Sequence, residues 1–435
     1  MNYSDTERVC GVLESLNLEE IEDTIKADIA ILTTCSVKQK AEDKVFSFIH
    51  NFYKARKKEG SNRKIFLTGC MVRQSSTQQD LKKDPLLHRI PELDGVFRIE
   101  DILKLPELLN VGPSIQKNSY LDILPKYKSP FQAFVPIQTG CDNFCTFCIV
   151  PFTRGRERSR PMEEVLKEIS FLAKKGLKEV TLVGQNVNSY GKGLMATNRA
   201  FDEEHSKWMD GNEKTPFTIL LEKIQEIDGI ERIRFQSSNP HDMTDDIVEA
   251  ICTLPKVMPH LHFALQSGNN SVLKRMNRKH HYEEYKNIVD SIRLKRPDFS
   301  ITTDIIVGFC GETEEEFQDS LRVFDEINPD LIYISQYSPR KGTASDNAMK
   351  NDIPQDKKKQ RWHIMNDYLK KHVAEKMQSL IGSQQKVLIE KVEGREAEGK
   401  TEHNYVCQIS GENISIGDIV SIKVIGASQW ALKGS

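Results

Sequence analysis

Hydrophobic and polar positions divide the chain into three stretches that differ in periodicity. The first stretch covers residues 1–110. It contains two short apolar runs suited to buried strands, at 27–34 and 65–67, and an amphipathic helical pattern lies between them. Strand–helix–strand order implies parallel pairing, because parallel strands need a crossover connection. We therefore predict a parallel α/β unit in which Cys35 and Cys70, at the ends of the two runs, face one crevice.

The second stretch repeats the strand–helix alternation six times between residues 133 and 339. Polar or glycine-rich residues follow several of the apolar runs, as in Thr139-Gly140-Cys141. Such loops gather at the carboxyl ends of a parallel α/β barrel, where these folds keep their chemistry. The pattern predicts a six-fold parallel α/β barrel, open or closed, with strands at 134–138, 179–183, 232–235, 261–265, 303–307 and 331–335.

The third stretch begins with a lysine-rich helix at 357–380 and continues with short alternating strands such as 386–392 and 418–425. Glycines between these strands indicate a small β-barrel that forms a separate module. The expected fold class is therefore α/β with a C-terminal β-barrel. The expected domains are 1–115, 127–356, a linking helix at 357–382, and 383–435.

Composition narrows the class of protein. The 435 residues are 38% hydrophobic and 29% charged, which is typical of a globular protein, and the net charge of −2 excludes a generally basic nucleic-acid coat. Residues 1–20 lack the apolar core of a signal peptide, and no run is long enough to span a bilayer. We expect a cytoplasmic protein with no membrane partner, whose cysteines stay reduced and serve metal binding or catalysis.

Three of the nine cysteines form the pattern C-x3-C-x2-C at Cys141, Cys145 and Cys148. Three thiolates from one loop can hold three irons of a 4Fe–4S cluster and leave the fourth iron open to an exogenous ligand. A structural zinc site is the alternative, but it needs a fourth cysteine or histidine at a suitable spacing, which the sequence does not offer. The spacing therefore favours an iron–sulfur cluster.

This motif directly follows a strand that opens a parallel α/β repeat, and it resembles that of radical S-adenosylmethionine enzymes. The resemblance implies that the amino and carboxylate groups of S-adenosylmethionine chelate the open iron. It also implies that Phe147 lies beside the adenine of this cofactor, although packing beneath the loop is an equally good interpretation.

The whole chain looks like a methylthiotransferase, and this resemblance implies an N-terminal cluster domain, a partial (βα)6 radical S-adenosylmethionine barrel and a C-terminal RNA-binding barrel of the TRAM type. The segments 151–155 (PFTRG) and 159–161 (SRP) are typical of that family. The segment 182–190 (LVGQNVNSY) resembles the members that act on N6-dimethylallyladenosine in tRNA. Members that modify threonylcarbamoyladenosine in tRNA or ribosomal protein S12 are the alternatives.

The resemblance implies methylthiolation at C2 of the adenine next to the anticodon. One S-adenosylmethionine would donate a methyl group to a sulfur held at the N-terminal cluster. A second would be cleaved reductively at the cluster of Cys141, Cys145 and Cys148, giving a 5′-deoxyadenosyl radical that abstracts the C2 hydrogen. That hydrogen is not acidic, so the cofactor carries the step and no catalytic side chain is assigned.

The same resemblance assigns Cys35 and Cys70 as ligands of a second 4Fe–4S cluster in the N-terminal domain. The family's first ligand lies in a Gly-Cys-Gln-Met-Asn motif and would precede Met1 by two residues, so we expect that the start was assigned too late. Cys10 is no substitute, because it stands beside Val9 in a helical stripe and is suited to packing.

Polar side chains at the strand ends are candidates for holding S-adenosylmethionine. By position these are Gln185, Asn186, Ser237, Gln266 and Asp304. Each of them is also open to interpretation as a loop cap without a ligand.

Two basic runs follow loops of the predicted active face and are candidates for neutralising tRNA phosphates: Arg154, Arg156 and Arg158, and Lys274, Arg278 and Lys279. A solvated charged face is the alternative interpretation of such runs. On the C-terminal barrel, Tyr405 and Trp430 could stack on bases or pack in its core.

We expect tRNA and a cellular electron donor as partners of a monomeric chain. The alternative from a different class is an iron–sulfur protein that binds RNA without catalysing a reaction.

Overall fold

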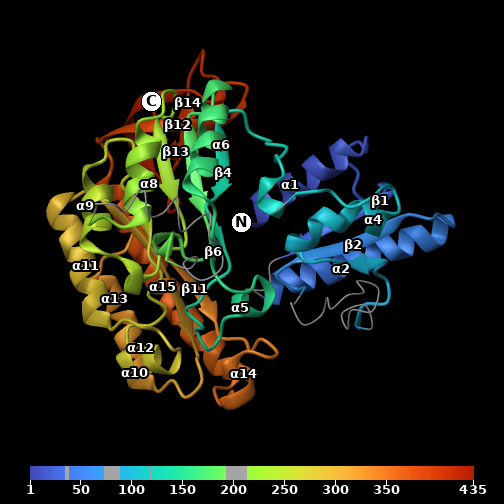
Figure 1. Ribbon diagram of the computed structural model, residues 1–435. Coiled ribbons are helices and arrows are strands. Elements are labelled where there is room, and N and C mark those ends of the chain that lie inside the picture. Colours follow the sequence, from blue (N-terminus) through green and yellow to red (C-terminus); the bar gives the residue numbers. More distant parts are fainter. Residues whose placement is uncertain (35–38, 73–88, 118, 193–212) are drawn as a thin grey trace. The chain divides into compact units, whose positions relative to one another are not determined.

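The computed structural model describes residues 1–34, 39–72, 89–117, 119–192 and 213–435 (Figure 1). The chain forms two compact units, Met1–Lys128 with Gln138–Arg160, and Ser129–Ile137 with Pro161–Ser435. The expected domain boundaries follow changes in sequence pattern, whereas these units follow packing, so the two divisions differ around the cysteine loop. Within the described ranges, every helix is too short or too polar to cross a lipid bilayer.

The first unit is built on a parallel sheet in the order β1-β2-β3 (Figure 1, in blue). Phe66 of β2 packs on one face with Val9 of α1, and its neighbours Ile65 and Leu67 pack on the other face with α2. The parallel pairing predicted from the sequence is confirmed. The elements of this unit are α1 (Asn2–Ser15), β1 (Ile29–Thr34), α2 (Gln39–Glu59), β2 (Lys64–Gly69), β3 (Gly95–Val96), η3 (Ile99–Lys104), α4 (Leu105–Leu109), η4 (Tyr120–Asp122), β5 (Gln138–Thr139), α5 (Val150–Thr153) and β6 (Arg158–Ser159).

The second unit contains six parallel strands, in the order β4-β7-β8 and then β9-β10-β11, as well as the C-terminal module. Single parallel bridges, from Ile233 to Val257 and from Ser238 to Phe263, join the two groups of three. This is the partial (βα)6 barrel predicted from the sequence, and every predicted strand overlaps an observed one. The strands are β4 (Gln132–Pro136), β7 (Glu179–Val183), β8 (Arg232–Phe235), β9 (His260–His262), β10 (Ser300–Val307) and β11 (Leu331–Gln336).

Amphipathic helices alternate with these strands. In α8, for example, Phe217, Leu220 and Ile224 recur at helical spacing and are buried. The helices are α6 (Met162–Lys174), η5 (Val187–Ser189), α8 (Pro216–Gln225), η6 (Pro240–Asp242), α9 (Asp245–Thr253), α10 (Asn270–Arg275), α11 (Tyr282–Lys295), α12 (Glu314–Leu321), α13 (Val323–Glu326), α14 (Ala344–Ala348) and α15 (Gln355–Ser379).

The C-terminal module is a closed barrel in the order β12-β13-β14-β16-β15 (Figure 1, in red). Arg232 and Arg234 of β8 donate to the carbonyl oxygens of Lys400 (3.0 Å) and Thr401 (2.8 Å), and Glu179 lies 2.9 Å from Arg234. The module therefore docks at the strand edge opposite to the loops that follow the strands. Its strands are β12 (Gln384–Glu393), β13 (Glu396–Thr401), β14 (Val406–Ser410), β15 (Ile419–Ala427) and β16 (Ala431–Gly434).

Candidate iron–sulfur and cofactor site

The loop that carries three cysteines is closed at its base by the antiparallel pair of β5 with β6. Gly140 leaves β5 with a φ of +80°, and the Cβ of any other residue there would collide with the carbonyl oxygen of Arg156. The Cys141 amide donates to the carbonyl oxygen of Gly155 at 3.3 Å. The two ends of the loop are therefore held together by contacts that only glycine permits at residue 140.

The thiols of Cys141, Cys145 and Cys148 are half-buried in this loop, and the Cys148 amide donates to the carbonyl oxygen of Cys145 at 2.9 Å. Burial raises the pKa of Cys141 to about 11 and that of Cys148 to about 12, and the charge of a Cys145 thiolate raises both. The thiols therefore lie within electrostatic reach of one another. A bound cation would reverse these shifts, because metals bind the thiolate form.

This donor set fits a 4Fe–4S cluster with one open iron, since three thiols share one loop. In the described parts of the chain, no three Cys, His, Asp or Glu side chains already form a group that could hold a metal ion. The loop thus supplies three thiol donors, but their sulfur atoms are not already arranged around a metal position. Asn143 Nδ2 lies 3.6 Å from Cys141 Sγ, and an N–H···S contact of this kind stabilises a thiolate ligand.

Cys70 follows β2 at the carboxyl edge of the first unit's sheet and is buried. Its amide donates to the carbonyl oxygen of Thr34, the last residue of β1, at 3.0 Å. A Cβ at Gly69, whose φ is +92°, would lie 2.5 Å from that oxygen. Cys35, the next residue after Thr34 in the chain, lies outside the described residues. Cys10 is half-buried within α1, as its position in the helical stripe predicts.

In the second unit, the carboxyl ends of neighbouring strands bring several predicted cofactor residues together. The Val187 amide donates to the carbonyl oxygen of Ser237 at 3.3 Å, which joins the loops after β7 and β8. The Gln266 amide donates to the carbonyl oxygen of Asp304 (2.9 Å), and the Ile306 amide donates to that of Gln266 (3.0 Å). Both the amide and the carbonyl group of Gln266 are therefore hydrogen-bonded to β10.

Ser237 and Gln266 both adopt left-handed backbone conformations, with φ of +72° and +81°. Such a conformation costs a residue other than glycine roughly 1–3 kcal/mol and persists only where the surroundings impose it. Strain of this kind concentrates at ligand sites. Ser237 lies two residues beyond the end of β8, and Gln266 lies four residues beyond the end of β9, so both belong to the loops that follow these strands.

Two further candidates already have partners that the sequence analysis missed. Asn186 is buried, and its Nδ2 donates to Asp242 Oδ2 at 2.7 Å. Asp304 Oδ2 lies 2.9 Å from Nε2 of His262, whose Nδ1 lies 3.1 Å from Thr302 Oγ1. The pairing of Thr302 with His262 across neighbouring strands produces this contact. Without strand order, the sequence offers no signal for it.

Phe147 and Gln185 are half-buried, which is compatible with packing as well as with a ligand. Their assignment to S-adenosylmethionine stays a prediction.

Arg154 corrects one prediction of an RNA contact. Its guanidinium retains 3% exposure and lies 2.5 Å from Asp5 Oδ2 and 3.1 Å from Asn2 Oδ1. Burial alone would lower the pKa of Arg154, but the Asp5 carboxylate raises it above its ordinary value. A buried arginine engaged in this way cannot neutralise a phosphate, so Arg154 is a structural residue of the first unit.

The other predicted RNA residues differ in exposure. Arg156 is 74% exposed, and its Nε lies 2.8 Å from Asp142 Oδ1. Arg158, Lys274 and Lys279 are exposed. Arg278 is half-buried, and its Nη2 donates to the carbonyl oxygen of Ala264 at 2.7 Å.

On the C-terminal barrel, Tyr405 and Trp430 have different environments. The Tyr405 hydroxyl donates to Asp330 Oδ1, and Lys376 lies 2.9 Å from the same oxygen. Burial raises the pKa of Tyr405, as does the Asp330 charge. Trp430 is 48% exposed. Tyr405 therefore anchors the module, whereas Trp430 is accessible for stacking.

Three protein families match successive parts of the chain. Residues 135–324 match the Radical SAM superfamily, residues 1–91 match the uncharacterized protein family UPF0004, and residues 378–435 match the TRAM domain. Together with the partial barrel and the cysteine loop, these matches define a radical S-adenosylmethionine enzyme. Membership of this superfamily implies a 4Fe–4S cluster and S-adenosylmethionine as cofactors.

Curated relatives narrow the class. The tRNA-2-methylthio-N(6)-dimethylallyladenosine synthase of Dictyoglomus thermophilum is 38% identical over 447 residues, covering 100% of this chain and 96% of the relative. That of Clostridium perfringens (strain SM101) is 37% identical over 100% of this chain and 95% of the relative. The chain belongs to the family of tRNA-2-methylthio-N(6)-dimethylallyladenosine synthases.

Among solved structures, the cobalamin-dependent S-adenosylmethionine radical enzyme OxsB is similar in fold. The TM-score is 0.50 and the identity 14%, over 85% of this chain and 53% of that chain. This likeness concerns the fold alone.

Proposed function

We propose that the chain methylthiolates C2 of N6-dimethylallyladenosine next to the anticodon of tRNA, with S-adenosylmethionine as methyl donor and radical source. The observation that carries this proposal is similarity along the full length to synthases of this reaction, 38% identity over 100% of the chain. The cysteine loop and the TRAM domain supply the two properties that the reaction needs, a redox centre and a module for RNA.

The chain's own residues bind and orient the reactants. Cys141, Cys145 and Cys148 hold the 4Fe–4S cluster, which supplies, when bound, the electron for cleaving S-adenosylmethionine. Ser237 and Gln266 contact the cofactor from the loops that follow β8 and β9, and their imposed backbone conformations fix where each side chain leaves the main chain. C2–H is not acidic, so what the protein contributes is position and exclusion of water.

Four further residues are candidates for contacts with S-adenosylmethionine in this proposal: Phe147, by resemblance beside the adenine, and, in the second unit, Gln185 and Asn186 after β7 and Asp304, which pairs with His262. Asn186 and Asp304 orient neighbouring side chains as well as the cofactor, because each already bonds within the chain.

We further propose that Cys35 and Cys70 are ligands of a second 4Fe–4S cluster, where the sulfur for transfer is held. The support from the described residues is the position of Cys70, buried at the carboxyl edge of the sheet against the end of β1. Iron and sulfide quantitation tests this proposal. Replacement of Cys70 by alanine should halve the iron content while the cluster at Cys141 stays intact.

The residues proposed to contact tRNA are the exposed arginines of the first unit and, in the second unit, the exposed lysines and the exposed indole of the barrel: Arg156, Arg158, Lys274, Lys279 and Trp430. Arg278 contributes its partly exposed guanidinium. A cellular electron donor and a monomeric state in the cytoplasm complete the proposal.

The decisive experiment is anaerobic reconstitution followed by incubation with S-adenosylmethionine and a reductant. We expect 5′-deoxyadenosine from the wild-type chain and none from Cys145→Ala. Cys252→Ala is a matched control, because Cys252 is a half-buried cysteine of α9 outside the loop. Wild-type yield no higher than that of Cys145→Ala would leave an iron–sulfur protein that binds RNA without catalysis.

Mass spectrometry of tRNA nucleosides from a deletion strain identifies the substrate. Loss of the methylthio group from dimethylallyladenosine is the expected result. Loss from threonylcarbamoyladenosine, or from ribosomal protein S12, would identify one of the sibling activities instead.

A further inference from the structure

The loop that follows β10, residues 308–313, is closed on itself by a buried carboxylate. Gly308 and Gly311 adopt φ of +71° and +69°, so the chain turns twice through conformations that favour glycine. The Glu312 side chain folds back and accepts the Gly308 N–H at 2.7 Å. The last residues of β10 are thus fixed by a contact from within their own loop.

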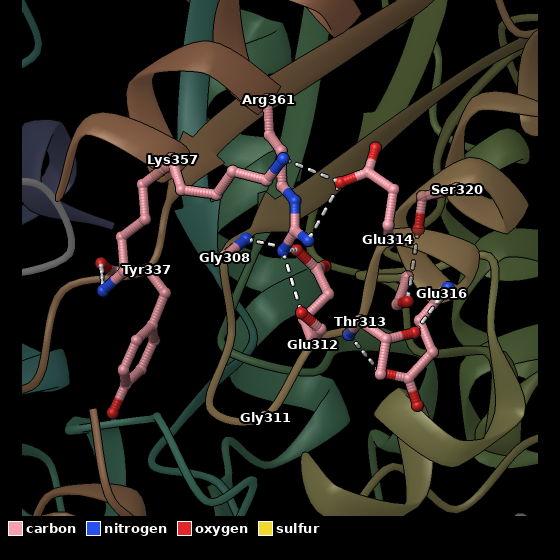
Figure 2. Close-up of polar contacts among 12 residues, drawn as sticks. Gly308, Gly311, Glu312, Thr313, Glu314, Glu316, Ser320, Tyr337, Lys357 and Arg361 are labelled. Atoms are coloured by element: carbon pink, nitrogen blue, oxygen red, sulfur yellow. Dashed lines mark hydrogen bonds and ion pairs between the residues drawn. The ribbon is translucent and has the colours of Figure 1, made fainter. Parts of the chain in front are cut away.

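Arg361 of α15 holds that carboxylate in place (Figure 2). Its Nη1 donates to Glu312 Oε2 at 2.7 Å and to the Glu312 carbonyl oxygen at 3.0 Å. The side chains are 4% and 1% exposed, respectively. Nη2 of Arg361 lies 3.4 Å from Glu314 Oε2, which Lys357 also contacts at 3.0 Å. A charge-assisted pair shielded from water fixes geometry more firmly than a neutral contact does.

The same loop is held from a second helix. Arg275 of α10 donates through Nε to the Cys310 carbonyl oxygen at 3.1 Å and pairs with both oxygens of Glu316, at 2.9 and 2.6 Å. Lys358 of α15 lies so close to Gly308 that any Cβ at that position would collide with it. Residues 308–316 therefore have little freedom while these contacts persist.

This loop is coupled to a proposed cofactor residue by main-chain hydrogen bonds. The Ile306 amide, two residues before Gly308, donates to the carbonyl oxygen of Gln266 at 3.0 Å. The Gln266 amide donates to the carbonyl oxygen of Asp304. A shift of the end of β10 would therefore move Gln266, whose backbone conformation is already imposed by its surroundings.

We propose that Arg361 is a positioning residue for S-adenosylmethionine. Acting through Glu312 and Gly308, it holds the end of β10 in the geometry that Gln266 needs to bind the cofactor. The inference rests on the proposed function. It places the control of cofactor affinity on α15, outside the residues 135–324 that match the Radical SAM superfamily.

Hydrogen exchange in the full-length, cluster-free chain tests the contact itself. We expect Arg361→Gln to speed exchange at least tenfold in peptides that cover 306–313, while exchange in β7 and β8 stays as in the wild type. Lys357→Gln is the matched control, because it removes a neighbouring cation of α15 that contacts Glu314 but not Glu312. Unchanged exchange in 306–313, or an equal increase throughout the chain, would overturn the proposal.

The dependence of 5′-deoxyadenosine formation on S-adenosylmethionine tests the consequence. We expect Arg361→Gln and Glu312→Gln to raise KM for S-adenosylmethionine at least fivefold and to change kcat by less than twofold. Arg361→Lys keeps the charge but not the paired hydrogen bonds, so it should fall between them and the wild type. A purely structural role would lower the amount of folded enzyme and leave KM unchanged.

If Arg361→Gln does not fold, Arg361→Lys decides, and a wild-type KM in that variant overturns the proposal. A wild-type chain that forms no 5′-deoxyadenosine would refute the proposed function instead. In that case the exchange measurement alone judges the contact between Arg361 and Glu312.

Discussion

The guanidinium of Arg154 lies 2.5 Å from the carboxylate of Asp5, and both side chains are buried. Arg154 follows α5 in the segment after the three cysteines, and Asp5 belongs to α1, 149 residues earlier in the chain. The pair therefore links the cysteine loop to the first helix within one compact unit. Its role is to fix this segment, since neither charge reaches solvent.

Replacement of Arg154 by glutamine should lower the free energy of unfolding by about 3–5 kcal/mol, because it leaves the Asp5 carboxylate buried without its counter-charge. Chemical denaturation measures the change. The double variant Arg154→Met with Asp5→Leu should lose less than Arg154→Gln alone, since no unpaired charge remains. A loss below about 1 kcal/mol for Arg154→Gln would contradict this account.

Replacement of Arg156 by glutamine should affect tRNA binding and not stability. Arg156 lies only two residues after Arg154, but its side chain is 74% exposed. We expect stability to change by less than about 0.5 kcal/mol. The affinity for tRNA should fall, and the slope of log K against log salt should decrease by about 1, as for the loss of one phosphate contact. Filter binding at several salt concentrations measures both. An unchanged slope would remove Arg156 from the tRNA surface.

The arrangement of strands could be predicted from the sequence because it depends on local periodicity. The apolar runs of β7 and β8 coincide with the observed strands, Glu179–Val183 and Arg232–Phe235. The cysteine loop could equally be predicted from the sequence, since its three candidate ligands lie within eight residues of the chain. Short-range patterns of this kind are enough to predict the strand arrangement and the metal donors.

Partners from distant segments could not be predicted. Arg154 was expected at a phosphate because it alternates with Arg156 and Arg158 after a loop of the predicted active face. Only the packing of α1 against its segment reveals Asp5. Tyr405 bonds Asp330 across 75 residues, and Asp304 bonds His262 across 42. These contacts depend on strand order and on the docking of modules, which composition and spacing do not encode.

Replacement of Tyr405 by phenylalanine should destabilise the chain by about 1–3 kcal/mol, because a partner of the buried Asp330 carboxylate is lost. Thermal unfolding measures the effect, and tRNA affinity should be unchanged. Trp430→Ala is the converse control, since the indole is 48% exposed. It should weaken tRNA binding with little effect on stability. A loss of tRNA affinity in Tyr405→Phe that exceeds the loss in Trp430→Ala would reverse the two roles.

Glu312 should make stability depend on pH. Burial raises the pKa of its carboxyl from 4.5 to about 7, against the opposing effects of Gly308 N–H and Arg361. The folded state therefore binds this proton more tightly than the unfolded state does. The contribution to stability is complete below about pH 4.5 and is lost as the pH rises through about 7.

The size of this effect is on the order of 3 kcal/mol for a shift of this magnitude. Denaturation of the wild type and of Glu312→Gln at a series of pH values isolates it, because glutamine keeps an acceptor for Gly308 without titrating. The difference in stability between the two chains should move in favour of Glu312→Gln as the pH rises from 5 to 8. A difference that stays constant with pH would show that Glu312 remains ionised throughout.

Replacement of Gln266 by glycine should separate folding from cofactor binding. The φ of +81° strains any residue with a Cβ, whereas glycine adopts it freely. Relief of strain worth roughly 1–3 kcal/mol offsets the greater entropy of glycine in the unfolded chain, so stability should change by less than about 1 kcal/mol. The side chain proposed to hold S-adenosylmethionine is lost at the same time. We therefore expect a normal denaturation midpoint together with a rise of at least tenfold in KM for S-adenosylmethionine.

Gly229, a loop glycine with a φ of +86°, provides the reverse comparison, since Gly229→Ala should lower stability without changing the KM for S-adenosylmethionine. If Gln266→Gly retains the wild-type KM, the strained backbone in the loop after β9 serves the fold alone and Gln266 is not a cofactor residue.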